Sequence, residues 1–221
     1  LLATFPLLSP GSSDFPLLIT PDDSRVYAVT SNDGGNGFNQ PQAVTAYDAP
    51  GLKLLKHYGV GVGFMANAGT DARISPGGEF LYTSGANTTT LSKLEIASDS
   101  EVDSVALPQY GEALNLSPDG ATLYAFENGY QSGQLRVFDA ATLDLVKTVD
   151  TQGQVARFLA TSRKSVFAPS GCAVIVPAPL QASIYALDPV SHAKLASFAT
   201  PGETAYVVEF APNSARAYLP S

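Results

Sequence analysis

Tryptophan is absent from this chain of 221 residues, and cysteine and histidine are nearly absent, with one and two copies. Without tryptophan, the chain cannot carry repeat motifs or cofactor-docking motifs built on that residue. The single cysteine, Cys172, excludes an internal disulfide and a metal site made of thiolates. Because it follows a turn at the start of an expected strand, we interpret it as a small buried hydrophobe and not as a reactive thiol. His57 and His192 are not at a spacing typical of metal ligands.

Charge is scarce as well. Only 14% of the residues are Asp, Glu, Lys or Arg, and the net charge is −8. An acidic chain with no cluster of Lys and Arg repels a phosphate backbone, so we expect no nucleic-acid partner. No apolar run is long enough to span a membrane. The low lysine content, with abundant Ser, Thr, Asn and Gly, favours an extracytoplasmic protein that is secreted, periplasmic or on the cell surface.

The chain does contain a sequence motif that occurs five times: a short apolar run, a Thr/Ser/Ala-Pro turn and a second apolar run. The turn prolines are Pro21, Pro76, Pro118, Pro169 and Pro212, which lie 42 to 55 residues apart. Short strands with a period of about 40–50 residues are typical of a β-propeller, in which each repeat is one blade. We therefore predict an all-β fold of four-stranded antiparallel blades, about four of them complete, with partial blades at both ends.

The repeat at residues 111–150 displays the strand order most clearly. Residues 112–116 alternate as an inner strand a, and residues 121–126, 134–139 and 143–149 form strands b, c and d. Between a and b, Pro118 presets φ and Gly120 accepts a positive φ. We predict one propeller domain over residues 1–221, divided as follows: 1–8 is strand d of a preceding blade, 15–60, 71–108, 111–150 and 163–200 are four blades, and 205–221 is strands a and b of a fifth.

An acidic residue ends strand c in each of the four blades, namely Asp48, Glu95, Asp139 and Asp188. An Asp side chain can accept backbone N–H groups of the turn that follows it. A position repeated in every blade usually serves the scaffold. We therefore interpret these acids as structural and not as catalytic.

A closing blade made from both ends of the chain would contain strands a, b and d but no strand c. The missing strand would leave two unpaired edges. We therefore expect this chain to be a portion of a propeller with six to eight blades, seven being favoured, or to be completed by another chain.

Residues 117–124, Ser-Pro-Asp-Gly-Ala-Thr-Leu-Tyr, followed by a Gly/Asn hairpin and by Val137-Phe138-Asp139, resemble the YVTN-type β-propeller repeat. That family includes cell-surface proteins, lactonase-like seven-bladed propellers and propeller subunits of periplasmic amine dehydrogenases, so the resemblance implies the fold and leaves the function open. Lactonase-like members are expected to use histidine, arginine and glutamate at the central channel. We expect His57 in an outer strand d and His192 in a c–d turn, away from that channel. We identify no catalytic residue and predict no cofactor.

The repeats are lengthened on one face. Pro21 and Asp48 are 27 residues apart, against 19 to 21 in the other blades, which places an insertion in the first b–c hairpin. The crossovers at about residues 59–70 and 151–164 are also long. Because b–c hairpins and d–a crossovers share one face of a propeller, and elaborated loops usually carry binding, we predict a ligand or partner site on this face. The candidate residues are Asn32, Asp33, Asn36, Phe38, Asn39, Phe64, Asn67, Arg157 and Arg163.

Three of these candidates suggest a ligand class. Asp33 lies among asparagines and glycines that could hold Ca²⁺, although a run with one carboxylate falls short of an EF-hand loop and an ordinary loop is the favoured interpretation. Arg157 and Arg163 form a modestly basic group that could meet an anion or simply be solvated.

These features favour a non-enzymatic extracytoplasmic propeller that binds a protein, glycan or surface partner through its b–c/d–a face. Two alternatives stay open. One is a lactonase-like or amine-dehydrogenase-type enzyme or subunit, with active residues partly outside this segment, for which contacts at Arg73, Glu112 or Glu209 would be expected. The other is a structural module that assembles through open blade edges.

Overall fold

The computed structural model describes ten stretches of the chain, and every regular element in them is a β-strand. The described residues are 17–30, 43–59, 70–85, 89–128, 133–150, 166–167, 174–178, 183–199, 209–210 and 217–218. The chain divides into two compact units, Leu1–Glu112 and Ala113–Ser221.

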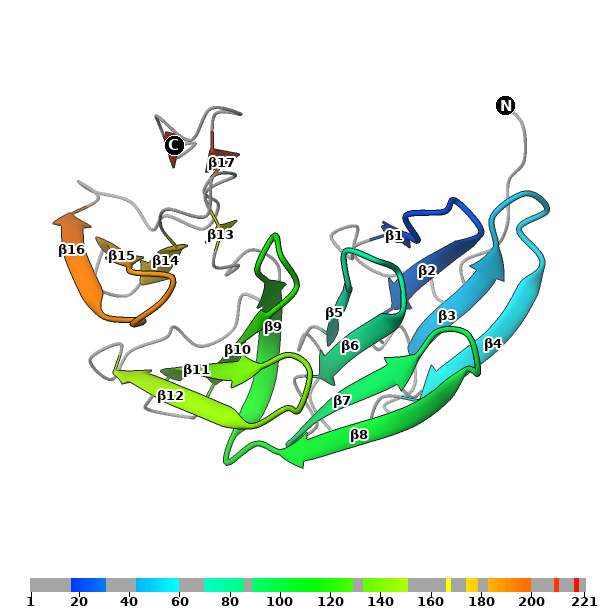
Figure 1. Cartoon of the computed structure of the whole chain (residues 1–221), viewed down its shortest axis with the longest axis horizontal. Coiled ribbons are helices and arrows are strands. Elements are labelled where there is room, and N and C mark those ends of the chain that lie inside the picture. The colour runs from blue at the N-terminus through cyan, green and yellow to red at the C-terminus, as the bar shows by residue number, and fades with distance from the viewer. Residues whose placement is uncertain are drawn as a thin grey trace, which may run out of the picture. The chain divides into compact units, whose positions relative to one another are not determined.

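The first unit holds two four-stranded antiparallel sheets (Figure 1). The first sheet consists of β1 (Leu17–Ile19), β2 (Arg25–Thr30), β3 (Ala43–Asp48) and β4 (Leu54–Gly59). The second sheet consists of β5 (Thr70–Ile74), β6 (Phe80–Gly85), β7 (Thr90–Glu95) and β8 (Ser100–Ala106). In both sheets the order in space is the order in sequence, so strand a is one edge and strand d is the other.

The remaining strands repeat the pattern. The third sheet consists of β9 (Tyr110–Leu116), β10 (Thr122–Asn128), β11 (Gly133–Asp139) and β12 (Leu145–Asp150). The fourth sheet consists of β13 (Val166–Phe167), β14 (Val174–Ala178), β15 (Ser183–Leu187) and β16 (Lys194–Ala199). Two further strands, β17 (Glu209–Phe210) and β18 (Ala217–Tyr218), pair with each other. The prediction of an all-β fold made of four-stranded antiparallel sheets is confirmed.

The Thr/Ser-Pro turns join strand a to strand b through the same hydrogen bonds in the first three sheets. In the third sheet, the Ser117 hydroxyl accepts the Thr122 N–H at 2.9 Å, and the Gly120 N–H donates to the Ser117 carbonyl at 2.8 Å. Thr20 and Ser75 make both contacts in their own sheets. The last turn residue has a positive φ in each case: 75° at Gly120, 81° at Gly78 and 56° at Asp23. Glycine adopts this conformation without strain, which explains its place in the motif.

The acid at the end of strand c closes the c–d turn. Asp188 Oδ1 accepts the N–H groups of Val190 at 3.1 Å and Ser191 at 2.6 Å. Asp139 Oδ1 accepts those of Ala141 and Thr142 at 2.8 and 3.0 Å. The hydrogen bonds from Ser191 hold the pKa of Asp188 below its ordinary value. The predicted structural role is confirmed for these two acids.

Each c–d turn ends on a residue in the left-handed conformation. These residues are Leu52 (φ 52°), Asp99 (52°), Leu143 (55°) and His192 (54°). Because Leu143 belongs to the turn, β12 begins at Leu145, two residues later than predicted. Just beyond the turn, the pairing of strands c and d shifts register in all four sheets, which is the signature of a β-bulge.

Within each unit, two sheets pack face to face around apolar side chains. In the first unit, Tyr27, Val44 and Ala46 of the first sheet cluster with Ala72 and Leu81 of the second. In the second unit the cluster consists of Tyr124, Phe126, Leu135 and Val137 of the third sheet with Leu187 of the fourth. Such face-to-face packing of small four-stranded sheets is the construction of propeller blades.

A polar contact accompanies the core of the first unit. Asp99, in the c–d turn of the second sheet, reaches the first sheet: its Oδ1 accepts hydrogen bonds from Arg25 Nη1 at 2.6 Å and from the Tyr58 hydroxyl. The Lys56 ammonium donates to the Asp99 carbonyl. Burial raises the pKa of Tyr58, so this phenol stays protonated and donates.

The second unit places a histidine at the matching position. His192 Nδ1 lies 2.8 Å from the Tyr124 hydroxyl of the third sheet, and Lys147 donates to the Ser191 carbonyl at 2.8 Å. Burial, helped by the positive charge of Lys147, lowers the pKa of His192. The positive-φ residue of the c–d turn therefore joins neighbouring sheets in both units.

Candidate functional site

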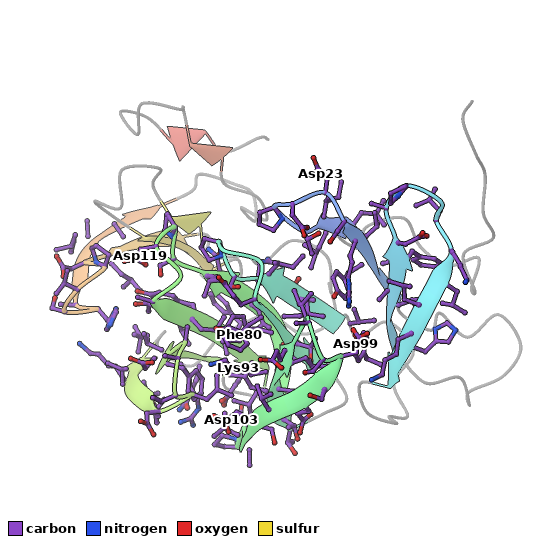
Figure 2. All side chains as sticks on the ribbon, turned by 45° about the vertical axis from the view of Figure 1, so that its right-hand side comes forward. Asp23, Phe80, Lys93, Asp99, Asp103 and Asp119 are labelled. Atoms are coloured by element: carbon purple, nitrogen blue, oxygen red, sulfur yellow. The ribbon has the colours of Figure 1, made fainter. Side chains whose placement is uncertain are left out.

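The two ends of the sheets use their polar side chains differently. At the end with the a–b and c–d turns, polar side chains bond to the backbone of their own turn or to the neighbouring sheet; Asp23, Asp99 and Asp119 in these turns are labelled in Figure 2. Because these bonds repeat from sheet to sheet, they belong to the scaffold. A functional side chain is more readily identified at a position that is polar in one sheet and apolar at the equivalent position of other sheets.

The second sheet has such a face. Asp71 and Arg73 of β5 stand opposite Ser84 and Tyr82 of β6, and Tyr82 stands opposite Lys93 of β7, so all five side chains share one face. Asp71, Ser84 and Lys93 are buried. In the first sheet Leu18, Val29 and Ala46 occupy the positions of Arg73, Ser84 and Lys93, and in the third sheet these positions hold Asn115, Phe126 and Val137. The repeat therefore does not require this polar face.

Asp71 and Arg73 cover a backbone edge. β5 is an edge strand of its sheet. The Ala72 N–H donates to Asp71 Oδ1 at 2.9 Å, and Arg73 Nη1 donates both to the Ala72 carbonyl at 2.5 Å and to Asp71 Oδ1 at 2.6 Å. The ion pair thus occupies an N–H and a C=O group that the sheet leaves unpaired. Covering such groups protects an edge from pairing with other chains.

Ser84 and Lys93 lie on the two central strands of the same face. The Ser84 hydroxyl is fully buried and has no hydrogen-bond partner among the residues that the structure describes. It lies against Gly111, where an added Cβ would be 3.0 Å from Ser84 Cβ and from Leu107 Cδ1, so a larger residue at position 111 would require these neighbours to move. The Lys93 ammonium lies 4.2 Å from the centre of the Phe80 ring, a favourable cation–π distance; both residues are labelled in Figure 2.

The third sheet holds a second set of charged residues found in only one repeat. Glu127 of β10 is completely buried and pairs through Oε1 with Arg136 Nε of β11. Arg136 also donates to Gln134 at 3.1 Å and to Thr148 at 3.4 Å. Glu127 Oε2 has no hydrogen-bond partner. Burial raises the pKa of Glu127, and Arg136 partly opposes this rise. The matching positions of the other three sheets hold no charged residue.

The residues predicted to bind ligand or partner are not placed by the structure. Asn32, Asp33, Asn36, Phe38, Asn39, Phe64, Asn67, Arg157, Arg163 and also Cys172 lie outside the described residues. The Ca²⁺ candidate Asp33 is among them. Within the described stretches, no three His, Cys, Asp or Glu side chains could together hold a metal ion.

The two histidines are where the sequence places them. His57 lies on the outer strand β4, is exposed, and bonds through Nδ1 with the Thr45 hydroxyl at 3.0 Å. His192 lies in the c–d turn of the fourth sheet and is buried. Both bond to a hydroxyl of the scaffold, so both have a structural explanation.

Sequence reasoning named Arg73 as an inner-strand residue but missed Asp71, Ser84, Lys93 and the Glu127–Arg136 pair. For Lys93, Glu127 and Arg136 a usable signal was present: aligning the four repeats on their turn prolines puts a charge in one copy where the other three have an uncharged residue.

No protein-family model matches the sequence, and no curated protein matches it. In structure the chain is similar to 1256 chains of solved structures. One of them is hydrazine synthase of Kuenenia stuttgartiensis, with a TM-score of 0.66 at 19% sequence identity; the match covers 96% of this chain and 57% of that one. This chain therefore spans little more than half the length of that relative. At this identity the likeness concerns the fold alone, and that fold is a β-propeller. The described residues include no helix that could cross a bilayer.

Proposed function

We propose that this chain is a non-enzymatic, extracytoplasmic propeller scaffold of the YVTN type, which binds a protein or glycan partner through its b–c/d–a face. The observation that carries the proposal is that the two ends of the sheets use their polar side chains differently. At the turn end, the polar side chains of the first three a–b turns and of the c–d turns are used in bonds that repeat from sheet to sheet.

Polar groups that are not shared between the repeats also favour a binding site at the b–c/d–a end of the sheets. Asp71 lies near the start of β5, and Ser84 and Glu127 lie near the ends of β6 and β10, where the d–a and b–c connections attach. Ser84 Oγ and Glu127 Oε2 are buried there without hydrogen-bond partners. Buried polar groups without partners are uncommon and often mark a functional region. In the sequence, Asn36 and Phe38 lie between β2 and β3, and Asn67 lies between β4 and β5.

The test compares variants on the two ends of the blades. The loop variants are Phe38→Ala with Asn39→Ala, and Phe64→Ala with Asn67→Ala. The matched control is Val190→Ala, which changes a side chain that is 86% exposed in a c–d turn. We expect at least one loop variant to lose binding to a panel of immobilised glycans and cell-surface proteins at unchanged melting temperature, while the control binds like the parent.

Two results would reject the proposal. If the control loses binding and the loop variants keep it, the binding face is the opposite one. If the purified chain instead hydrolyses lactones, and this activity falls on substitution of inner-strand residues, the enzyme alternative replaces the scaffold.

A further inference from the structure

The side chain of Arg73 is only partly used by the contacts that hold it. Its Nη1 carries two hydrogens, and both have acceptors, Asp71 Oδ1 at 2.6 Å and the Ala72 carbonyl at 2.5 Å. Within the part of the chain that the structure describes, the other edge of the guanidinium, formed by Nε and Nη2, makes no hydrogen bond or ion pair, and neither nitrogen is a buried atom without a partner. The side chain is 16% exposed. Three N–H donors therefore remain available on a side chain whose position is fixed at one nitrogen.

We propose that this Nε–Nη2 edge binds a carboxylate group of a ligand at the inner edge of the blade. The two edge nitrogens of a guanidinium match the two oxygens of a planar oxyanion in a bidentate pair. In a propeller the innermost strand of each blade borders the central channel, and β5 is the first strand and an edge of its sheet. Asp71 acts as a positioning residue, because it holds Nη1 and leaves the opposite edge exposed.

Protection of the sheet edge explains Nη1 of the arginine, which caps the Ala72 carbonyl, but it does not use the Nε–Nη2 edge. Capping an unpaired N–H on an edge strand requires only an acceptor from the preceding residue. Asn115 caps the Leu116 N–H of β9 at 3.0 Å in this way, and Asp103 caps the Ser104 N–H of β8 at 2.8 Å. Asp71 does the same for Ala72 without any contribution from Arg73.

The charge of the neighbourhood selects the ligand class. Asp71 already offsets the positive charge of Arg73, and the chain as a whole carries −8. A doubly charged phosphate would meet more repulsion here than a singly charged carboxylate. The carboxylate of a uronic acid or of an acidic peptide side chain therefore fits better than a phosphate.

The test is a titration of the purified chain followed by the ¹H–¹⁵N resonances of arginine Nε. Glucuronate and acetate are the carboxylate probes, glucose is the uncharged comparison and inorganic phosphate the dianionic one. We expect both carboxylates to shift the Arg73 resonance saturably, with a Kd of roughly millimolar size, and phosphate to bind more weakly. Glucose should leave it unchanged.

Two variants distinguish the contribution of the bidentate edge to glucuronate binding from the contribution of the positive charge alone. Arg73→Lys keeps the charge but loses the edge and with it the Nε resonance, so its binding is compared with that of the parent by calorimetric titration. We expect it to bind glucuronate about tenfold more weakly or worse. Arg25→Lys is the matched control, since Arg25 is also tied through Nη1 to one Asp Oδ1 at 2.6 Å and is similarly exposed. It should bind glucuronate within about twofold of the parent chain.

The proposal is overturned if the parent chain gives no saturable shift at Arg73, if Arg73→Lys binds glucuronate as well as the parent, or if phosphate binds more tightly than the carboxylates. The titration of the parent needs no substitution, so a variant that folds poorly does not prevent the test. Failure here would leave the proposed loop-face function untouched, because Arg73 lies on a strand and not in those loops.

Discussion

Replacing Arg136 by methionine should destabilise the protein far more than replacing both members of its ion pair. Glu127 is completely buried and forms an ion pair with Arg136. Removing one member of a buried pair leaves a charge without compensation and typically costs about 3–5 kcal/mol. For a chain of this size each kcal/mol lowers the melting temperature by about 2–4 °C. Arg136→Met should therefore melt about 6–20 °C below the parent.

The double variant Glu127→Leu with Arg136→Met is the matched control. Buried ion pairs can often be exchanged for apolar residues of similar volume at little cost, and the sibling sheets carry uncharged residues at these positions. We expect the double variant to recover most of the stability that the single variant loses, measured by urea unfolding at constant m-value. A double variant as unstable as Arg136→Met would refute the reasoning, because the loss would then come from packing and not from the unpaired charge.

The pH dependence gives a second and independent readout. Burial already raises the pKa of Glu127 above its ordinary value of 4.5, and Arg136 opposes that rise. Without the arginine, the folded-state pKa rises further. Since the folded protein then holds this proton more tightly than the unfolded chain, stability is complete below pH 4.5 and is lost as the pH rises through the raised pKa. Arg136→Met should thus lose more stability at pH 8 than at pH 5, and Glu127→Gln in the same background should remove that difference.

Three further outcomes are expected. Ser117→Ala should lower the free energy of unfolding by about 0.5–1.5 kcal/mol, because the Thr122 N–H loses its acceptor, whereas Ser117→Thr should be nearly neutral; equal losses in both would contradict this. Asp99→Ala should lower the melting temperature at low salt and at high salt alike, since its bonds join two sheets and are only partly exposed; a loss that vanishes in high salt would indicate mere surface attraction. The pKa of His192 is lowered by burial, so stability should be complete above its ordinary pKa of about 6.5 and fall as the pH drops through it, and His192→Leu should flatten the urea midpoint between pH 5 and 8.

Much of the fold could be predicted because its signals are local. Each a–b turn is built from residues within six positions of one another. In the first three turns, the hydroxyl residue before the proline accepts hydrogen bonds, and the residue that ends the turn has a positive φ. The acid at the end of strand c is local in the same sense. Boundaries were less exact: in the third sheet strand a begins two residues earlier than predicted, at Tyr110, and strand b ends two residues later, at Asn128. The late start of strand d arose because a leucine, Leu143, gives no sign that its backbone will adopt the left-handed conformation.

The sites were harder, because their chemistry lies between residues that are far apart in sequence. Asp99 and His192 occupy equivalent turn positions, yet nothing nearby in the chain indicates that one meets Arg25, 74 residues away, and the other Tyr124, 68 residues away. Whether Arg73 can bind a ligand likewise depends on which of its nitrogens already donate hydrogen bonds to the backbone of β5 and to Asp71.

The amino-acid sequence by itself determined the strands, their turns and the period that groups them in fours, since turn chemistry and side-chain alternation act over a few residues. Only the tertiary structure decided which polar side chains are buried, paired or left with open donors. That outcome depends on which face of a sheet another sheet covers, and an unpaired polar group has its energetic cost only after water has been excluded from it.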